Sequence, residues 1–288
     1  MRHSRVDVGG IHSPLIEAGP REATEAVVFV HGNPGSSTDW RELVRVVGEH
    51  GRAVAFDLPG FGQADKPADF AYQVGSYAEF IDGALTQLEI ERVHLVLHDF
   101  GGPFGLVWGI QHPSAWASLV LINIGVMPGY QWHTMAQRWR TPVVGELTQA
   151  WIPRWAWRRA MQSPRINPRG LPPAFVDKMY DDYDRATRRT VLKLYRATPA
   201  PGDTSAVLGA ALAPLNKPAL VIWGAKDPFV GVRFAEVQRE FFDVSDVVIL
   251  PESGHWPFQD DPEPVHEAVA SFIAGRLGQP AADSAPAP

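Results

Sequence analysis

The chain has 288 residues, of which 45% are hydrophobic and 20% charged, a composition that argues against a disordered or membrane-spanning protein. Its formal net charge of −6, from 26 basic and 32 acidic residues, predicts no electrostatic footprint for a phosphate backbone and excludes nucleic acid as an expected partner. The chain contains no cysteine, which excludes disulfides and thiolate catalysis.

The N-terminal residues 1–19 are charged and contain glycines, and they lack the apolar segment of a secretory signal. No apolar run in the sequence approaches the roughly 18 residues that a membrane-spanning helix needs. We therefore expect a cytoplasmic protein without a membrane partner. Residues 278–288 are mostly small or polar and contain prolines, which predicts a disordered tail.

Short apolar runs along the chain predict the strands of a buried parallel sheet. We expect strands at residues 26–30, 53–56, 93–97, 119–124, 219–223 and 246–250. Helical spacing of apolar residues predicts helices at residues 76–88, 102–112, 232–242 and 262–275. This alternation predicts an α/β fold with a mostly parallel, doubly wound sheet.

Residues 127–214 interrupt this alternation, because they are rich in tryptophan, arginine, tyrosine and proline and contain no valine-rich strand run. We interpret them as an inserted helical cap. The chain is then divided into a first core part at residues 1–126, the cap, a second core part at residues 215–277 and the tail. A cap over the carboxyl ends of parallel strands would enclose a pocket where such sheets bind ligands.

The predicted strand at residues 93–97 is followed by the sequence HDFGG, in which two glycines come shortly after Asp99. A strand, a sharp turn and a helix are typical of a nucleophile elbow, where small residues must follow the nucleophile. Leu97 stands where the serine-enzyme motif has its first glycine, so the match depends on the structural context. An ordinary charged turn is the alternative interpretation of Asp99.

An acid and a histidine follow at the ends of two later strands. Asp227 lies in WGAKDP after one predicted strand, and His255 lies in SGHWP after the next. The order nucleophile, acid, histidine is that of α/β hydrolases. Alone, each would be read as a turn, cap or surface group, but their arrival at successive strand ends indicates a catalytic set. We expect His98 to pack or hydrogen-bond behind the elbow.

The loop HGNPG at residues 31–35 follows the strand at residues 26–30. We predict that backbone N–H groups of Asn33 and Phe100 converge on one oxygen and form an oxyanion hole. A plain loop between a strand and a helix is the alternative interpretation.

In combination, the motifs HGNPG, DLPGFG at residues 57–62, HDFGG, WGAKDP and SGHWP resemble the α/β-hydrolase superfamily, and within it the group of epoxide hydrolases and haloalkane dehalogenases. The resemblance covers about residues 20–275. It implies an α/β-hydrolase fold with Asp99 as the nucleophile, His255 as the base and Asp227 as the acid. It implies no cofactor and no metal.

A carboxylate nucleophile explains this choice of residues. Asp99 attacking an sp3 carbon forms an alkyl ester and expels an alkoxide or a halide, and water activated by His255 then cleaves that ester. Asp227 would orient the imidazole and stabilise its charged form. An esterase is less expected, because an aspartate nucleophile would have to form an anhydride.

The leaving group separates the two activities. Haloalkane dehalogenases hold the halide with a tryptophan directly after the nucleophile and with an asparagine in the HGNP loop or a tryptophan in the cap. This sequence has Asn33, but it has Phe100 after the nucleophile, whose side chain offers no N–H group. Trp151 is either a second halide donor or a packing tryptophan of the cap.

Epoxide hydrolases open the ring with cap tyrosines, one of which lies in a Tyr-Arg segment about thirty residues before the acid. Tyr195, which is followed by Arg196, fits that position. A phenol can hydrogen-bond the epoxide oxygen and protonate the alkoxide, which would otherwise leave poorly. Packing within a helix is the alternative interpretation of Tyr195.

The second tyrosine of such enzymes has no counterpart at its family position near residues 149–151. Tyr130 is the next choice. Trp132 and His133 either substitute for it or line the substrate pocket.

From these residues we predict an epoxide hydrolase that converts a small apolar epoxide to a vicinal diol. Haloalkane dehalogenase is the alternative. A catalytically idle ligand-binding protein is a third hypothesis, against which the intact set of Asp99, Asp227 and His255 argues. We expect a monomer or a homodimer.

Overall fold

The structure is a computed structural model that describes residues 1–150, 152–198 and 200–279. An eight-stranded sheet runs through its centre in the order β1-β2-β4-β3-β5-β6-β7-β8. The strands are β1 (Arg2–Val8), β2 (Ile11–Ala18), β3 (Glu25–Val30), β4 (Arg52–Phe56), β5 (Arg92–His98), β6 (Trp116–Ile122), β7 (Pro218–Gly224) and β8 (Asp243–Leu250). The pairs β1–β2 and β2–β4 are antiparallel, and the pairs from β4 to β8 are parallel.

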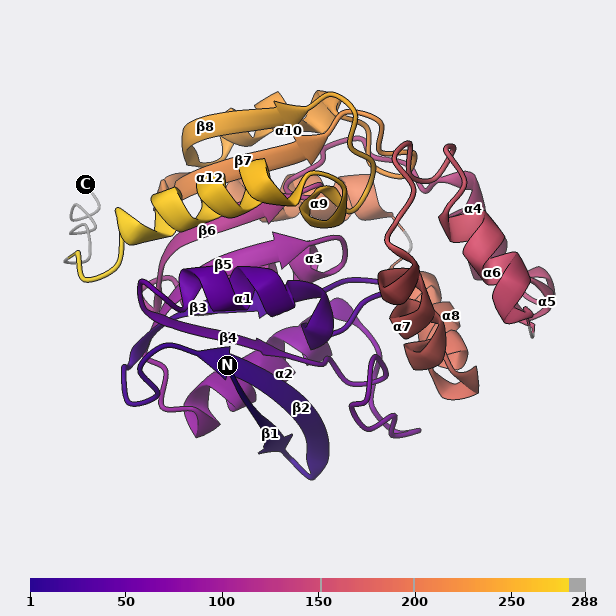
Figure 1. The fold of residues 1–288 in the computed structure, drawn as a ribbon, viewed down its shortest axis with the longest axis horizontal. Coiled ribbons are helices and arrows are strands. Elements are labelled where there is room, and N and C mark those ends of the chain that lie inside the picture. The colour runs from indigo at the N-terminus through magenta and orange to yellow at the C-terminus, as the bar shows by residue number, and fades with distance from the viewer. Residues whose placement is uncertain (151, 199, 280–288) are drawn as a thin grey trace.

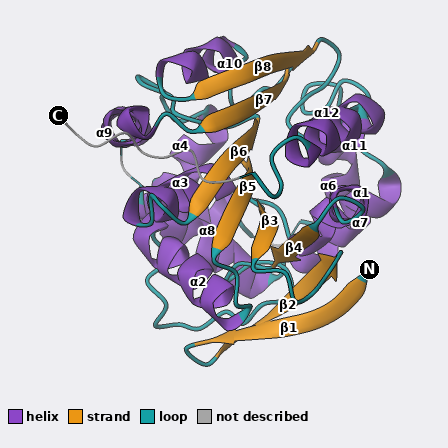
Figure 2. Cartoon of the chain, turned by 90° about the vertical axis from the view of Figure 1, so that its left-hand side faces the viewer, coloured by secondary structure: helices purple, strands orange, loops and turns teal. Residues whose placement is uncertain are grey.

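Helices cover both faces of the sheet, as Figures 1 and 2 show. On one face lie α2 (Val74–Gln87) and α3 (Gly101–Gln111), and on the other lie α1 (Arg41–Val47), α11 (Pro257–Asp260) and α12 (Pro262–Ala274). Successive residues of the central strands alternate between the two cores, so Val28 packs with the first set of helices and Val27 with the second. Both faces being covered explains why these strands read as continuous apolar runs.

The six predicted strands correspond to β3 to β8, which confirms the expected mostly parallel sheet. The antiparallel hairpin of β1 and β2, which the sequence analysis did not predict, adds two strands at one edge of the sheet. Residues of β1 are mostly exposed, so their pattern carries little apolar signal. The turn itself is signalled by Gly9 and Gly10, which both adopt positive φ angles, 60° and 82°, as a two-residue hairpin loop requires.

The helix predicted at residues 232–242 is shorter in the structure. α10 spans Arg233–Val237, and a 3-10 turn follows it. The buried side chain of Gln238 at this break accepts a hydrogen bond from the N–H of Val126 and donates to the carbonyl of Val126, each over 2.8 Å. Gln238 thereby fastens the end of α10 to the segment that leaves β6.

The segment between β6 and β7 is helical and leaves the sheet at the carboxyl ends of the parallel strands (Figure 1). Its helices are α4 (Thr134–Arg140), α5 (Val144–Thr148), α6 (Arg154–Met161), α7 (Pro173–Asp182), α8 (Arg185–Ala197) and α9 (Pro201–Leu212). α9 returns to the core and packs against α3. The assignment of residues 127–214 to a cap domain stays a prediction, and the predicted tail lies mostly outside the described residues.

None of the helices in the described ranges has the length and apolar character needed to cross a bilayer.

Candidate active site

The turn after β5 places Asp99 at the start of α3. Asp99 adopts a φ angle of +49°, in the left-handed region that side chains rarely occupy. A Cβ atom at Gly101 would lie 2.1 Å from the carbonyl oxygen of Val30, so only glycine fits there. The tight turn therefore presents the Asp99 side chain beyond the end of the strand, as a nucleophile elbow does.

The two carboxylate oxygens of Asp99 have different surroundings. Oδ1 accepts a hydrogen bond of 2.7 Å from the backbone N–H of Asn33, and Oδ2 lies 3.5 Å from Nε2 of His255. The hydrogen bonds of the described residues include none from the N–H of Phe100 to this carboxylate. Gly32 leaves room for the group, because a Cβ atom there would lie 2.3 Å from Oδ1.

His255 and Asp227 form a short buried pair. Nδ1 of His255 lies 2.7 Å from Oδ2 of Asp227, whose side chain is fully buried. The other oxygen of Asp227 accepts hydrogen bonds from the N–H groups of Phe229 and Val230, over 2.7 and 3.0 Å. The structure thus brings Asp99, His255 and Asp227 into one line, although their segments are far apart in the sequence.

Asn123 is a residue of this site that the sequence analysis did not identify. It follows β6 with a φ angle of +49° and is fully buried. Its amide donates to Oδ2 of Asp227 over 2.7 Å and to the carbonyl of Gly254 over 3.2 Å, and it accepts from the N–H of Gly224 over 2.9 Å. Asn123 holds the acid in place, and its only sequence signal is its position directly after a predicted strand.

Interactions between the charges of Asp99, Asp227 and His255 determine the protonation state of each of these groups. Burial alone raises the pKa of Asp99, but the hydrogen bond and charge of His255 outweigh it and lower this pKa to about 2. Burial alone lowers the pKa of His255, but the charge and hydrogen bond of Asp227, with those of Asp99, raise it to about 10. The charge of His255 likewise overcomes burial and lowers the pKa of Asp227. At neutral pH, the resting site therefore holds two carboxylates around one imidazolium.

His98 lies directly behind this set. Its Nε2 group donates a hydrogen bond of 2.8 Å to the backbone carbonyl of His255. Burial lowers the pKa of His98 to about 3, so its ring is neutral at physiological pH. His98 thus fixes the loop that carries His255 without adding charge.

Tyr195 extends from α8 toward Asn33 and Phe100, which flank Asp99. Its hydroxyl lies 3.5 Å from Nδ2 of Asn33, and its ring meets that of Phe100 edge to face, with centroids 4.9 Å apart. Tyr195 is buried, and burial holds the pKa of its hydroxyl well above the ordinary value. Its hydroxyl donates to no acceptor among the described residues.

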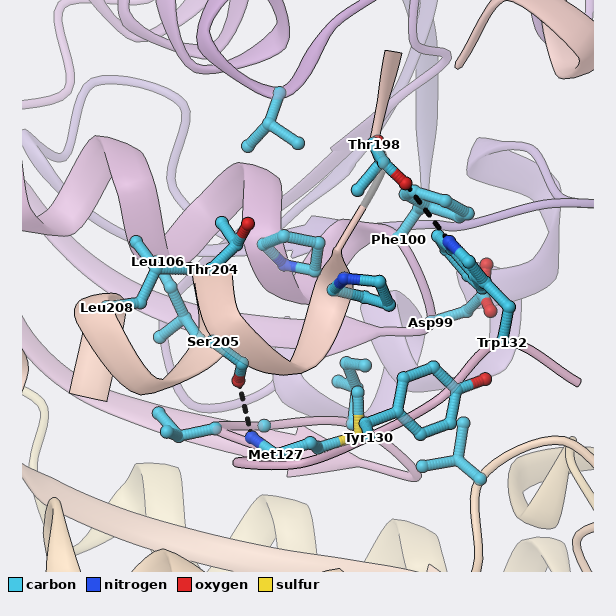
Figure 3. A pocket seen from close by; sticks show the side chains of 17 residues that line it. Asp99, Phe100, Leu106, Met127, Tyr130, Trp132, Thr198, Thr204, Ser205 and Leu208 are labelled. Atoms are coloured by element: carbon cyan, nitrogen blue, oxygen red, sulfur yellow. Dashed lines mark hydrogen bonds between the residues drawn. The ribbon is translucent and has the colours of Figure 1, made fainter. Parts of the chain in front are cut away.

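Tyr130 and Trp132 both line an apolar pocket next to Asp99. The Tyr130 hydroxyl and the Trp132 indole N–H, however, already have hydrogen-bond acceptors. The Tyr130 hydroxyl donates to the carbonyl of Phe229 over 3.2 Å, and the Trp132 indole N–H donates to the carbonyl of Thr198 over 3.0 Å, the latter visible in Figure 3. A ligand would have to displace these bonds to use either donor.

His133 caps the start of α4, where its Nδ1 accepts a hydrogen bond of 3.3 Å from the N–H of Ala136. Its ring packs on Phe229, which in turn packs on His255, with centroid distances of 4.9 and 5.1 Å. Burial lowers the pKa of His133 to about 4, so it is neutral at physiological pH. Trp151, the other expected pocket residue, lies outside the described residues.

An apolar pocket extends from Asp99 between α3 and α9, and Figure 3 shows Leu208 at its opposite end. Its lining residues are Val74, Asp99, Phe100, Pro103, Leu106, Ile124, Gly125, Val126, Met127, Tyr130, Trp132, Thr198, Pro201, Thr204, Ser205, Leu208 and Val230. The hydroxyl of Ser205 accepts a hydrogen bond from the backbone N–H of Met127. The pocket therefore offers an apolar wall to a ligand whose reactive atom faces Asp99.

Across residues 1–150, 152–198 and 200–279, no three His, Asp or Glu side chains are grouped so that they could hold a metal ion. The polar groups identified around Asp99 are protein side chains and backbone N–H groups.

Comparison with curated proteins identifies relatives that align along most of the chain. A haloalkane dehalogenase of Mesorhizobium japonicum is 27% identical over 296 residues, which cover 94% of this chain and 91% of the relative. A cis-3-alkyl-4-alkyloxetan-2-one decarboxylase of Xanthomonas campestris is 27% identical over 292 residues, covering 93% and 95%.

Solved structures show the same relationship. The haloalkane dehalogenase DbeA from Bradyrhizobium elkani superposes with a TM-score of 0.82 at 26% identity, covering 95% of this chain and 98% of DbeA. The epoxide hydrolase VrEH1 from Vigna radiata shares the fold with a TM-score of 0.78 at 22% identity, covering 95% and 98%. The family described as alpha/beta hydrolase fold matches residues 25–262. The chain therefore belongs to the α/β-hydrolase superfamily, within which it is similar to haloalkane dehalogenases in sequence and to epoxide hydrolases in fold.

Proposed function

We propose that the protein is an epoxide hydrolase that converts a small apolar epoxide to a vicinal diol through an ester on Asp99. The observation that carries the proposal is the hydroxyl of Tyr195, which is buried beside Asn33 and donates to no acceptor among the described residues. Its raised pKa keeps the phenol protonated, as an acid for an alkoxide must be. The apolar pocket would hold the rest of the substrate.

The first step is ring opening. Asp99 is ionised at neutral pH, and its Oδ2 atom, which the N–H of Asn33 does not hold, attacks a ring carbon. The carbon–oxygen bond of the ring breaks, and the departing oxygen takes the proton of Tyr195. The ester has lost the charge of Asp99, so the pKa of His255 falls, and His255 returns a proton to the tyrosinate.

The second step is hydrolysis of the ester. His255, now neutral, takes a proton from a water molecule that attacks the carboxyl carbon of Asp99. The N–H of Asn33 would stabilise the charge that develops on Oδ1. The bond between the carboxyl carbon of Asp99 and Oδ2 breaks, and Oδ2 leaves with the substrate as an alkoxide. The alkoxide takes the proton of the new carboxyl group to give the diol, and the Asp99 carboxylate and protonated His255 are restored.

Haloalkane dehalogenase is the second candidate, and the side-chain amide of Asn33 is the observation that favours it. A departing halide needs N–H donors, and the side chain of Phe100 offers none. Trp132 is the one tryptophan among the described pocket-lining residues, and its N–H group is bonded to Thr198. One amide donor beside a free phenol therefore supports an oxygen leaving group better than a halide.

The proposal is tested by the intact mass of the His255→Gln variant after exposure to separate panels of epoxides, haloalkanes and cis-3,4-dialkyloxetan-2-ones. Loss of the base should leave the ester on Asp99, and we expect an adduct from epoxides that is absent when Asp99→Asn is added. An adduct from haloalkanes alone or oxetanones alone would reject the epoxide hydrolase. A protein that binds these compounds without any adduct would be the idle ligand-binding protein.

A further inference from the structure

We infer that the side chain of Asn33 is a positioning residue for ring opening, because it donates a hydrogen bond to the oxygen of Tyr195 and so leaves the phenol proton to the substrate. This role rests on the proposed epoxide hydrolase. It differs from a direct contact with a leaving group, because Asn33 acts through Tyr195.

The backbone fixes where the Asn33 side chain lies. The N–H of Asn33 donates to Oδ1 of Asp99 over 2.7 Å, so a movement of the Asn33 backbone would break this hydrogen bond. From there, Nδ2 extends to 3.5 Å from the hydroxyl of Tyr195. Asn33 is 5% exposed and Tyr195 3%, so water does not readily replace either partner. Hydrogen bonds of catalytic groups are often long before substrate binds, and we expect this one to shorten in the complex.

The other half of the amide supports a functional role. Oδ1 of Asn33 is buried and has no hydrogen-bond partner in the described part of the chain. A buried acceptor without a partner costs stability and needs an explanation. The hydroxyl group that ring opening creates would be a donor for this oxygen. The amide would thus serve both the acid and its product.

The orientation of the amide decides what the phenol can do. With Nδ2 toward Tyr195, the hydroxyl oxygen accepts one hydrogen bond and its own proton points elsewhere. When that proton passes to the ring oxygen, the phenolate formed keeps the N–H bond, which then becomes charge-assisted and stronger. The contribution of Asn33 should therefore be largest in the transition state of ring opening.

A double-mutant cycle tests this coupling. The His255→Gln protein is combined with Asn33→Ala, Tyr195→Phe or both, and the rate of ester formation from one reactive epoxide is followed by intact mass. Tyr195→Phe should slow ester formation about 10²-fold or more, as for other acid catalysts. Asn33→Ala should slow it about tenfold, and less than about twofold when Tyr195 is already phenylalanine.

Gln149→Ala is the matched control. The amide of Gln149 donates to the hydroxyl of Tyr183 over 3.0 Å, so this variant also removes a buried amide–phenol bond, but from a pair with no hydrogen bond to the triad. Its rate of ester formation should stay within about twofold of the parent rate. With His255 intact, Asn33→Ala should slow ester formation and leave ester hydrolysis unchanged, whereas a general structural defect would slow both steps.

The outcomes separate this inference from the proposed function. The role of Asn33 would be overturned if the reductions in ester-formation rate caused by Asn33→Ala and Tyr195→Phe multiply in the double variant, or if Asn33→Ala slows ester formation and hydrolysis equally. The proposed epoxide hydrolase would be unaffected by either result. Epoxide adducts that form as fast with Tyr195→Phe would overturn Tyr195 as the acid and, with it, this inference. No adduct from any epoxide would reject the proposed function itself.

Discussion

Nε2 of His255 lies 3.5 Å from Oδ2 of Asp99, so the proposed base faces the proposed nucleophile. In the resting protein, the charge of Asp99 helps to keep His255 protonated, with its pKa raised to about 10. An imidazolium cannot take a proton from water. In the proposed mechanism, His255 would therefore become a base only after Asp99 has formed its ester and lost its charge, and this order would prevent His255 from activating water before the ester exists.

Asp99→Asn removes one carboxylate from His255 and should lower its pKa from about 10, while Asp227 keeps it above the ordinary value of 6.5. The ring nitrogens of His255, followed by NMR in a pH titration, measure this change. An unchanged pKa would show that Asp227 alone sets the charge of His255.

The pH dependence of stability follows from the same groups. The folded pKa of His255 is raised, so its contribution to the free energy of unfolding is complete below the unfolded pKa of 6.5 and is lost as the pH rises through about 10. The folded pKa of Asp99 is lowered, so its contribution is present above 3.8 and is lost as the pH falls through about 2. Urea unfolding of the parent and His255→Gln should converge between pH 7 and 10. A constant difference would contradict the coupling.

Gly32→Ala should inactivate the protein without unfolding it. The added Cβ atom would lie 2.3 Å from Oδ1 of Asp99 and would push the carboxylate aside. A displacement of about 1 Å of a reacting group costs on the order of 10²-fold in rate. Ester formation and thermal unfolding measure the two effects. Gly75→Ala in α2 is the control, because apart from its chain neighbours and its own helix backbone no heavy atom lies within 4 Å of the new Cβ. Full activity of Gly32→Ala would show that the carboxylate can adapt.

Asn123→Ala should slow hydrolysis of the ester rather than its formation. The change removes the amide that holds Asp227, so the rate of hydrolysis should fall about tenfold, the equivalent of one hydrogen bond to a charged group of about 1.5 kcal/mol. Single-turnover kinetics separate the two steps. Ser118→Ala, on the strand that Asn123 follows, removes a buried hydrogen bond to His94 and should lower stability without changing the relative rates of the two steps. Equal slowing of both steps would argue against a role of Asn123 in holding the acid.

Leu208→Trp should reduce the maximum chain length of the substrates that the protein accepts. Leu208 closes the end of the pocket opposite Asp99, and each methylene that can no longer be buried costs about 0.8 kcal/mol, or about fourfold in kcat/KM. Terminal epoxides of increasing chain length measure the effect. The neighbouring Val207, which is 71% exposed, provides the control Val207→Trp. The same chain-length dependence in both variants would place the substrate elsewhere.

The positions of Asp99, Asp227 and His255 were predictable because each follows a parallel strand, and the carboxyl ends of parallel strands meet at one edge of a sheet. Turn chemistry supported them, since glycines must follow a nucleophile held at a φ angle of +49°. Their roles in catalysis stay predictions until the experiments above are made.

Hydrogen-bond partners could not be predicted in the same way. The acceptors of Tyr130 and Trp132 are backbone carbonyls that are distant in sequence, at Phe229 and Thr198, and no local pattern reveals them. Asn123 could not be predicted for a related reason, because it contributes to the site through three hydrogen bonds to residues that are distant in sequence. Sequence patterns thus located the proposed catalytic groups, while tertiary contacts determine which of the nearby donor groups already have acceptors.

The unequal surroundings of the two Asp99 oxygens have a consequence for the fate of atoms. If the oxygen that faces His255 forms the bond to the substrate, that oxygen leaves in the diol, and an oxygen from water replaces it in the carboxylate. The first diol released after transfer to ¹⁸O-labelled water would carry unlabelled oxygen, and the label would emerge one cycle later. Asp99 would in this sense be a reagent that is consumed and rebuilt in each turnover, and its carboxylate would record the isotopic composition of the water used in the previous one.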